Sequence, residues 1–110
     1  VNGAQILMLG ITFKENCPDV RNTKIVDVIR ALESYSTKVT LFDPWANPTE
    51  VMHEYQLSCH SELDKTKKFD AIILGVAHNE FKTLDLHPFK KDNAVVYDVK
   101  GILKDCDGKL

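Results

Sequence analysis

Residues 7–23 have the sequence Leu7-Met8-Leu9-Gly10-Ile11-Thr12-Phe13-Lys14-Glu15-Asn16-Cys17-Pro18-Asp19-Val20-Arg21-Asn22-Thr23. An apolar strand pattern ends at Gly10, a polar loop with the cations Lys14 and Arg21 follows, and a helical pattern then begins. This order is typical of α/β folds, which hold a ligand at the carboxyl end of a strand. Cations just before a helix N-terminus suit an anion, because the free N–H groups and the helix dipole point the same way. The stretch therefore predicts a site for an anion such as phosphate.

The rest of the chain alternates between strand and helix patterns. Strands are predicted at residues 5–10, 38–42, 57–59, 70–76 and 94–99, and helices at residues 23–35, 48–55, 61–67 and 78–83. Asn22 or Thr23 is expected to cap the first helix. The apolar positions of this helix predict a buried stripe formed by Ile25, Val28, Ile29 and Leu32.

This alternation predicts the fold class. An α/β fold is expected, a Rossmann-like three-layer sandwich with a five-stranded parallel sheet in the order 3-2-1-4-5. Such an order has a switch point between the first and fourth strands, and open α/β sheets bind ligands there. The loops after Gly10, Gly75 and Val99 are expected to meet at this point.

Composition limits the classes of function. A chain of 110 residues, 44% hydrophobic and 27% charged, suits one globular domain. The net charge of -2 argues against nucleic-acid binding, and no apolar run approaches the roughly 20 residues of a membrane span. Three widely spaced cysteines and the lack of a signal peptide predict free thiols in the cytoplasm. Val1 in place of Met suggests a fragment of a longer protein.

Neither a dinucleotide site nor a metal site is expected within these residues. A dinucleotide site needs a second glycine soon after Gly10, and none follows within reach. Asp43 ends the second strand, where a ribose-binding acid would lie, but it stands alone. His53 and the pair Cys59-His60 lack the spacing of a zinc site.

Four motifs follow one another along residues 7–103. They are Gly10-Ile11-Thr12-Phe13-Lys14-Glu15-Asn16-Cys17-Pro18-Asp19-Val20-Arg21-Asn22-Thr23, Phe42-Asp43-Pro44, Val76-Ala77-His78-Asn79-Glu80-Phe81 and Tyr97-Asp98-Val99-Lys100-Gly101. In this order they resemble the C-terminal domain of the UDP-glucose/GDP-mannose dehydrogenase family. They are most similar to the branch that acts on UDP-N-acetylhexosamines, including the Vi-antigen type of enzyme. The set is specific, although no single motif would be convincing alone.

The resemblance implies that residues 1–110 are the single UDP-binding C-terminal domain of a longer NAD-dependent UDP-sugar 6-dehydrogenase. Such an enzyme oxidises the C6 alcohol of a UDP-N-acetylhexosamine to a uronate for surface polysaccharide biosynthesis, through a cysteine thiohemiacetal and a thioester. NAD and that cysteine belong to an N-terminal domain that this chain lacks, and a central helical region builds a homodimer. By this resemblance the fragment has no cofactor and no catalytic residue of its own, and it should be inactive alone.

The resemblance also implies which residues contact the UDP-sugar: Phe13, Lys14, Arg21 and Lys100. Lys14 would contact the diphosphate, a task that suits the compact charge of an ammonium group. Lys100 would reach the substrate from its own or a neighbouring subunit. For Arg21, bracing of the loop through Asp19 is an equally good interpretation.

Other residues have more ordinary interpretations. His78 and Glu80 follow the fourth strand and are expected to cap a loop, since no nucleophile lies near them. Trp45 either covers the sheet edge or lies at an interface. Cys17 is not expected to be a nucleophile, because the family's catalytic cysteine belongs to a different motif.

Two other classes of protein remain open from the sequence. One is a stand-alone nucleotide-binding or regulatory module, and the other is a CoA-binding or flavodoxin-like domain of the same architecture. The sequence does not distinguish the sugar or its epimer.

Overall fold

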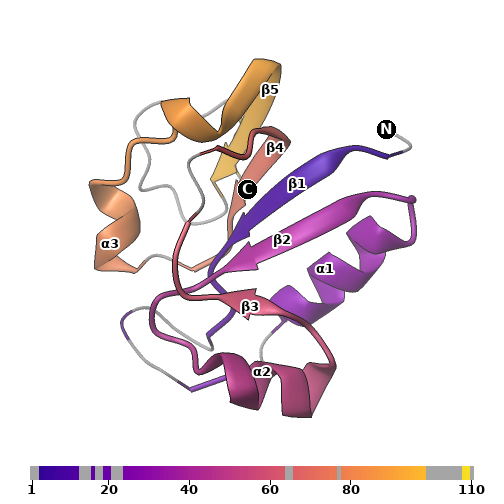
Figure 1. The fold of residues 1–110 in the computed structure, drawn as a ribbon, viewed down its shortest axis with the longest axis vertical. Coiled ribbons are helices and arrows are strands. Elements are labelled where there is room, and N and C mark those ends of the chain that lie inside the picture. The colour runs from indigo at the N-terminus through magenta and orange to yellow at the C-terminus, as the bar shows by residue number, and fades with distance from the viewer. Residues whose placement is uncertain are drawn as a thin grey trace.

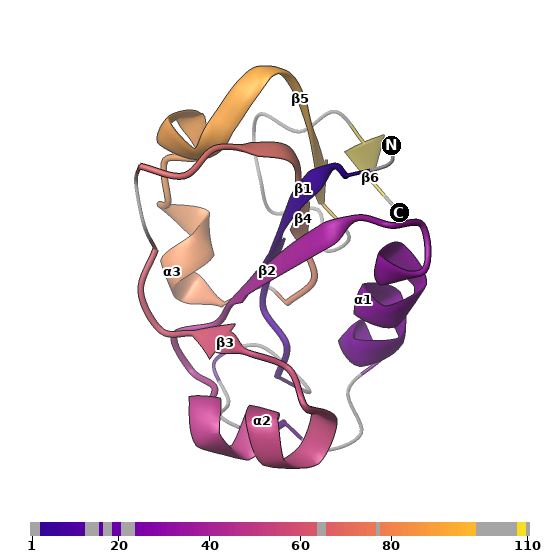
Figure 2. The same ribbon diagram turned by 45° about the vertical axis from the view of Figure 1, so that its right-hand side comes forward.

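A parallel β-sheet forms the centre of the computed structural model, which describes residues 3–12, 16, 19–20, 24–63, 66–76, 78–98 and 108–109. Within these residues the strands are β1 (Gln5–Leu9), β2 (Lys38–Phe42), β3 (Cys59–His60), β4 (Phe69–Leu74), β5 (Lys90–Asp98) and β6 (Gly108–Lys109). They pair in the order β3-β2-β1-β4-β5-β6, and every pair is parallel. Figure 1 shows the strands β1 to β5, and Figure 2 also shows β6. The predicted order 3-2-1-4-5 is confirmed, and the two-residue β6 extends it at one edge.

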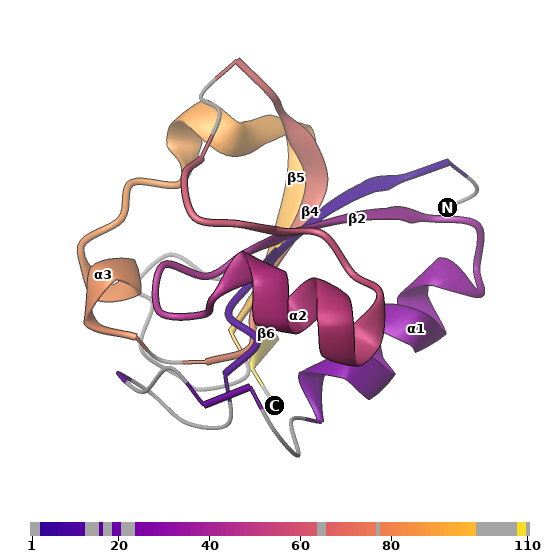
Figure 3. The ribbon, with the colours of Figure 1, turned by 60° about the horizontal axis from the view of Figure 1, so that its bottom comes forward.

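Helices cover both faces of this sheet. The helices α1 (Ile25–Glu33) and α2 (Pro48–Tyr55) pack on one face, and α3 (Asn79–Lys82) and the 3-10 helix η1 (His87–Phe89) pack on the other. Figure 2 shows α1 and α3 on opposite sides of the strands, and Figure 3 shows α1 beside α2. Arg30 of α1 donates a hydrogen bond of 2.9 Å from Nη2 to the carbonyl of Tyr55 at the end of α2. The predicted three-layer α/β architecture is confirmed.

The central strand β1 is buried on both faces. Leu7 and Leu9 belong to a core cluster with Phe81 of α3, whereas Met8 belongs to a second cluster with Ile29 of α1. Side chains of a strand alternate between faces, so β1 supplies both cores. Full burial of each such side chain contributes about 1.5–3 kcal/mol.

The buried stripe of α1 differs from the prediction. Ile29 is buried and Ile25 packs against the core, as expected, but Val26 is also buried whereas Val28 is 41% exposed. Successive helical residues are about 100° apart, so a helix that turns Val26 and Ile29 toward the sheet must turn Val28 toward solvent. The three- and four-residue spacing was therefore correct, but the centre of the stripe was wrong. The predicted caps Asn22 and Thr23 lie outside the described residues.

Two predicted elements, β2 and α2, match the structure at both ends. Asn47 caps α2, because its Oδ1 accepts the N–H groups of Thr49 at 2.8 Å and Glu50 at 3.4 Å. Pro48 occupies the first turn, where its missing N–H costs nothing. The last helical residue is Tyr55. The C-cap Gln56 has a φ of 56°, and this left-handed conformation stops the helix.

The predicted helix at residues 61–67 is wrong. Ser61–Leu63 and Thr66–Lys67, the described residues of this range, are not helical. Residues 61–68 must carry the chain from edge strand β3 past β2 and β1 to β4, a displacement of about 14 Å across the sheet. Seven helical residues span only about 10 Å along the axis. A helix over residues 61–67 is therefore too short for this crossing.

Two strands begin at other residues than predicted, because a strand begins where its backbone first pairs with a neighbouring strand. β3 begins at Cys59, two residues later than predicted, where it meets Leu41 of β2. β5 begins at Lys90 in place of residue 94, since Lys90 pairs with Phe69 before the register shifts ahead of Ala71. No helix among the described residues is both long enough and apolar enough to cross a membrane.

Gly10 directly follows β1 at the carboxyl edge of the sheet, where the main chain passes close to Val76. Its φ is +96°, and its N–H donates to the carbonyl of Phe42 at 2.8 Å. A Cβ atom at this position would lie 2.7 Å from Cβ of Val76 and 3.0 Å from its main-chain nitrogen. Both the dihedral angle and the contact therefore require glycine here.

Gly10→Ala is expected to lower the free energy of unfolding by about 2–4 kcal/mol, because it adds backbone strain and a clash with Val76. Gly3→Ala is the matched control, since Gly3 has φ +79° but no atom near its would-be Cβ. The control should lose only the strain, about 1 kcal/mol. Urea unfolding of the purified chain, followed by circular dichroism, measures both values. Equal losses would show that the contact with Val76 does not matter.

Candidate functional site

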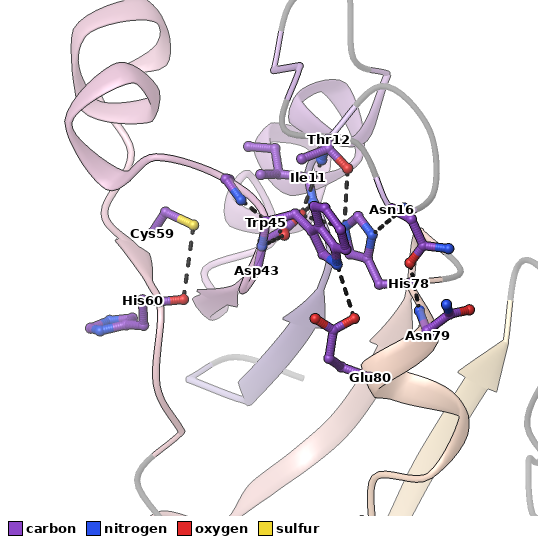
Figure 4. A network of polar contacts seen from close by, with 11 residues as sticks. Ile11, Thr12, Asn16, Asp43, Trp45, Cys59, His60, His78, Asn79 and Glu80 are labelled. Atoms are coloured by element: carbon purple, nitrogen blue, oxygen red, sulfur yellow. Dashed lines mark hydrogen bonds and ion pairs between the residues drawn. The ribbon is translucent and has the colours of Figure 1, made fainter.

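The buried carboxylate of Asp43 lies just after β2 and binds main-chain donors from two sides (Figure 4). Its Oδ2 accepts the N–H of Ile11 at 2.7 Å and of Thr12 at 3.2 Å, which follow β1. Its Oδ1 accepts the N–H of Trp45 at 2.8 Å and of Ala46 at 3.2 Å. Asp43 has no exposed surface, so these four donors replace water around the charge.

Opposing effects act on the pKa of Asp43. Burial raises this pKa, because the charged form loses its hydration. The hydrogen bonds from His78 and from the N–H groups of Ile11 and Trp45 favour the charged form and outweigh burial. The pKa of Asp43 therefore lies below its ordinary value of 3.8, and the carboxylate is ionised at neutral pH.

His78 follows β4 and reaches the same carboxylate from the other side of β1. Its Nε2 lies 3.0 Å from Oδ2 of Asp43 and 3.0 Å from Oγ1 of Thr12. Its Nδ1 accepts the N–H of Asn16 at 2.8 Å. An accepting Nδ1 carries no proton, so the ring proton is on Nε2, where it faces the carboxylate. The fully buried imidazole thus joins the segments that follow β1, β2 and β4.

Asn16 makes a second connection to the same segment. Its φ is 54°, a left-handed conformation that asparagine tolerates better than most residues. Its Oδ1 accepts the N–H of Asn79, the first residue of α3, at 2.9 Å. Asn16 therefore accepts a hydrogen bond from an N–H group at the start of α3 that has no partner within the helix, although the two residues are 63 positions apart in the sequence.

Trp45 covers this network on the solvent side. Its ring stacks on the imidazole of His78, with centroids 6.0 Å apart and planes at 26°, and it is 37% exposed. Its Nε1–H donates to Oε1 of Glu80 at 2.9 Å. Phe81 packs on His78 at a centroid distance of 5.4 Å. The sheet-edge position, one of the two interpretations open from the sequence, is therefore observed, and a position at an interface stays a prediction.

The predicted site residues Phe13, Lys14, Arg21 and Lys100 lie outside the described residues. The structure instead describes positions next to them. Thr12 and Asn16 flank residues 13–15, and both contact His78.

Other predictions for this edge can be compared directly with the structure. His78 was expected to cap a loop, and its bond to Asn16 confirms this. Glu80 contacts Trp45. Asp43 was expected to stand alone, whereas both of its oxygens have partners, and no role was predicted for Asn16. For Asn16, the one signal in the sequence is that asparagine tolerates left-handed backbone better than most residues do.

The described residues of this edge that could hold a ribose or a metal ion can be examined one by one. Asp43 lies where a ribose-binding acid would be, but both of its oxygens already accept hydrogen bonds from this chain and none of its surface is exposed. Among the described residues, no group of three or more His, Cys, Asp and Glu side chains could hold a metal ion. The described contacts of this edge hold the main-chain segments that follow β1, β2 and β4 together.

Sequence comparisons identify relatives of this chain. Residues 7–105 match the family described as UDP-glucose/GDP-mannose dehydrogenase family, UDP binding domain. The chain is 49% identical over 106 residues to the UDP-N-acetyl-D-glucosamine 6-dehydrogenase of Salmonella typhi. This match covers 94% of this chain and 25% of that protein. It is 44% identical over 113 residues to the enzyme of the same name from Pseudomonas aeruginosa, across 100% of this chain and 26% of that protein. The chain therefore spans about a quarter of the length of these relatives.

Solved structures show the same fold. The NDP-N-acetyl-D-galactosaminuronic acid dehydrogenase from Methanosarcina mazei Go1 matches with a TM-score of 0.80 at 21% identity, over 94% of this chain and 22% of that one. At this identity the match supports the Rossmann-like architecture alone.

Asp43→Asn is expected to lower the free energy of unfolding by about 3 kcal/mol at pH 7. An amide accepts hydrogen bonds at only one atom, so one pair of buried N–H groups, either Ile11 with Thr12 or Trp45 with Ala46, would face an NH₂ group. Because the folded pKa of Asp43 is lowered, its stabilisation is present above pH 3.8 and is lost as the pH falls further. The difference between wild type and variant should therefore narrow in acid, as measured by urea unfolding at several pH values.

Asp70→Asn provides the control for this experiment. Asp70 also accepts a main-chain N–H, that of Gln5 at 2.7 Å, and it pairs with Lys91 at 3.3 Å, but it is partly exposed at the opposite end of β1. Water can replace these contacts, so its loss should be much smaller. Equal losses in the two variants would contradict the role given to the buried position of Asp43.

Proposed function

The chain belongs to the UDP-glucose/GDP-mannose dehydrogenase family through its UDP-binding domain, and on that premise we propose that it binds the UDP moiety of a UDP-N-acetylhexosamine. The resemblance inferred from the sequence motifs is confirmed at the level of the family, and the N-acetylglucosamine enzymes are among its relatives. The choice of sugar follows from those two relatives, at 49% and 44% identity.

The observation that supports the position of this site is the anchoring of Thr12 and Asn16. These residues flank residues 13–15 and are held by His78 at the carboxyl ends of β1 and β4, where open α/β sheets bind ligands. In our proposal Lys14 contacts the diphosphate and Phe13 lines the same site.

Arg21 and Lys100 complete the proposed site. Arg21 follows Val20, whose carbonyl accepts a hydrogen bond from the hydroxyl of Tyr55, and it precedes α1. Lys100 follows β5, which ends at Asp98 beside Leu74 of β4. Lys100 thus follows a strand that ends at this edge, Arg21 precedes the N-terminus of α1, and both would add positive charge near the diphosphate.

The whole protein would be an NAD-dependent oxidoreductase that converts the C6 alcohol of the UDP-sugar to a uronate for surface polysaccharide. In this proposal residues 1–110 form its C-terminal domain, and an N-terminal domain binds NAD. Oxidation of the alcohol to a carboxylate consumes one water molecule and releases two hydrides, so two NAD molecules would accept one hydride each in succession. A central helical region would form a homodimer. The buried free thiol of Cys59 is compatible with a cytoplasmic location. Residues 1–110 alone would bind UDP without turning over the sugar, since remote binding energy only positions the reacting carbon.

Lys14→Ala in the complete enzyme is expected to weaken UDP binding about ten- to a hundredfold, the loss of one charge-assisted contact to phosphate. Lys38→Ala is the control, because Lys38 is an exposed lysine at the amino end of β2, the opposite edge of the sheet. Calorimetric titration with UDP measures both affinities, and thermal melts check folding. Unchanged affinity in Lys14→Ala would remove the centre of this proposal.

Cys59→Ser in the complete enzyme is expected to leave turnover within about twofold of wild type. Burial, and then the charge of Asp43, raises the pKa of the Cys59 thiol to about 12, so the reactive thiolate is scarce at neutral pH. Cys17 and Cys106, which lie outside the described residues, are also expected to be dispensable. NADH absorbance with the UDP-sugar measures turnover. A folded Cys59→Ser variant slowed by several orders of magnitude would show that the nucleophile lies in this domain.

A further inference from the structure

The two nitrogens of the His78 ring contact different parts of the molecule. Nε2 faces the carboxylate of Asp43 and the hydroxyl of Thr12, which are both buried at the carboxyl edge of the sheet. Nδ1 accepts only the main-chain N–H of Asn16 at 2.8 Å among the contacts described. Asn16 in turn holds the first N–H of α3 through its side chain. One ring therefore combines an internal contact with a contact to a loop (Figure 4).

We propose that His78 is a positioning residue for UDP binding and that it acts through Nδ1 and Asn16. The proposal rests on the function proposed above, because it assumes that the residues next to Asn16 meet the diphosphate. In this arrangement Nε2 serves stability, since it satisfies the buried Asp43 carboxylate. Nδ1 serves binding, since it fixes the backbone of Asn16 before the ligand arrives, and a pre-ordered loop loses less entropy on binding.

The two roles can be separated because two amide side chains each reproduce one half of the imidazole. Glutamine can place an NH₂ group near the position of Nε2 and donate to Asp43, but it has no acceptor near Nδ1. Asparagine can place its Oδ1 near the position of Nδ1 and accept the N–H of Asn16, but it does not reach Asp43. His78→Gln should therefore keep the stabilising contact, and His78→Asn should keep the binding contact.

The test compares both variants in the complete enzyme. We expect His78→Gln to weaken UDP binding about five- to tenfold in calorimetry, the equivalent of about one hydrogen bond, and to raise KM for the UDP-sugar more than it lowers kcat. We expect His78→Asn to bind UDP within about twofold of wild type but to melt at a lower temperature than His78→Gln. The order of the variants is thus opposite for affinity and for stability. A residue with a purely structural role would give the same order in both measurements.

Asn16→Gly tests the same anchor from its other partner. Glycine keeps the N–H toward His78 and the left-handed backbone, but it removes the side-chain bond to Asn79 and adds backbone freedom. Asp43 and His78 are unchanged, so the fold should be little affected. We expect weaker UDP binding of about threefold or more, the equivalent of a fraction of one hydrogen bond. This variant decides the question if His78→Gln does not fold.

Wild-type UDP affinity in a folded His78→Gln variant, or in Asn16→Gly, would overturn the inference. Affinity that falls in step with the melting temperature across all variants would also overturn it, because His78 would then be structural only. Lys14→Ala separates this failure from that of the function itself. If Lys14→Ala weakens UDP binding and His78→Gln does not, only the positioning role is wrong, whereas unchanged binding in both removes the proposed site.

Discussion

The contact between the buried Asp43 carboxylate and the His78 imidazole determines the geometry of the carboxyl edge of the sheet. A buried charge is tolerated only when its hydrogen-bonding capacity is filled, and here four main-chain N–H groups and one ring nitrogen do so. These donors come from segments after β1, β2 and β4, so satisfying one charge fixes three chain segments relative to each other. Gly10 makes this possible, since only a residue without Cβ lets β1 pass Val76 so closely.

Much of the fold could be predicted because its signals are local. β2 and α2 were predicted to the residue, since strand alternation and the Pro48 turn depend on neighbours in sequence. The helix predicted at residues 61–67 failed because a capping serine says nothing of the distance between β3 and β4. The predicted burial of Val28 was wrong for a related reason. Apolar spacing predicts a stripe along the helix, but it does not give the angle at which this stripe faces the sheet.

The site was less predictable than the fold. The predicted strand order places Asp43 and His78 after the two strands that flank β1, at one edge of the sheet, but their contact depends on side-chain directions around β1, which no spacing encodes. The anchor at Asn16 depends on a left-handed backbone and a partner 62 positions away. The roles of Phe13, Lys14, Arg21 and Lys100 come from family resemblance, because a lysine after a strand is usually only solvated. They stay predictions.

The contacts of Asp43 also bear on how this edge can evolve. The donors at positions 11, 12, 45 and 46 are main-chain groups, so any residue except proline could supply them. The hydrogen bonds to the carboxylate therefore do not depend on which side chains these four residues carry, although Thr12 and Trp45 make side-chain contacts of their own with His78. Asp43 lacks this freedom, since its two oxygens accept all four bonds, and a replacement for His78 must donate a hydrogen bond to the same carboxylate. The frame of this edge is thus encoded by one acidic side chain and the path of the main chain, so a substitution of the half-exposed Trp45 could change the surface while the carboxylate keeps its donors.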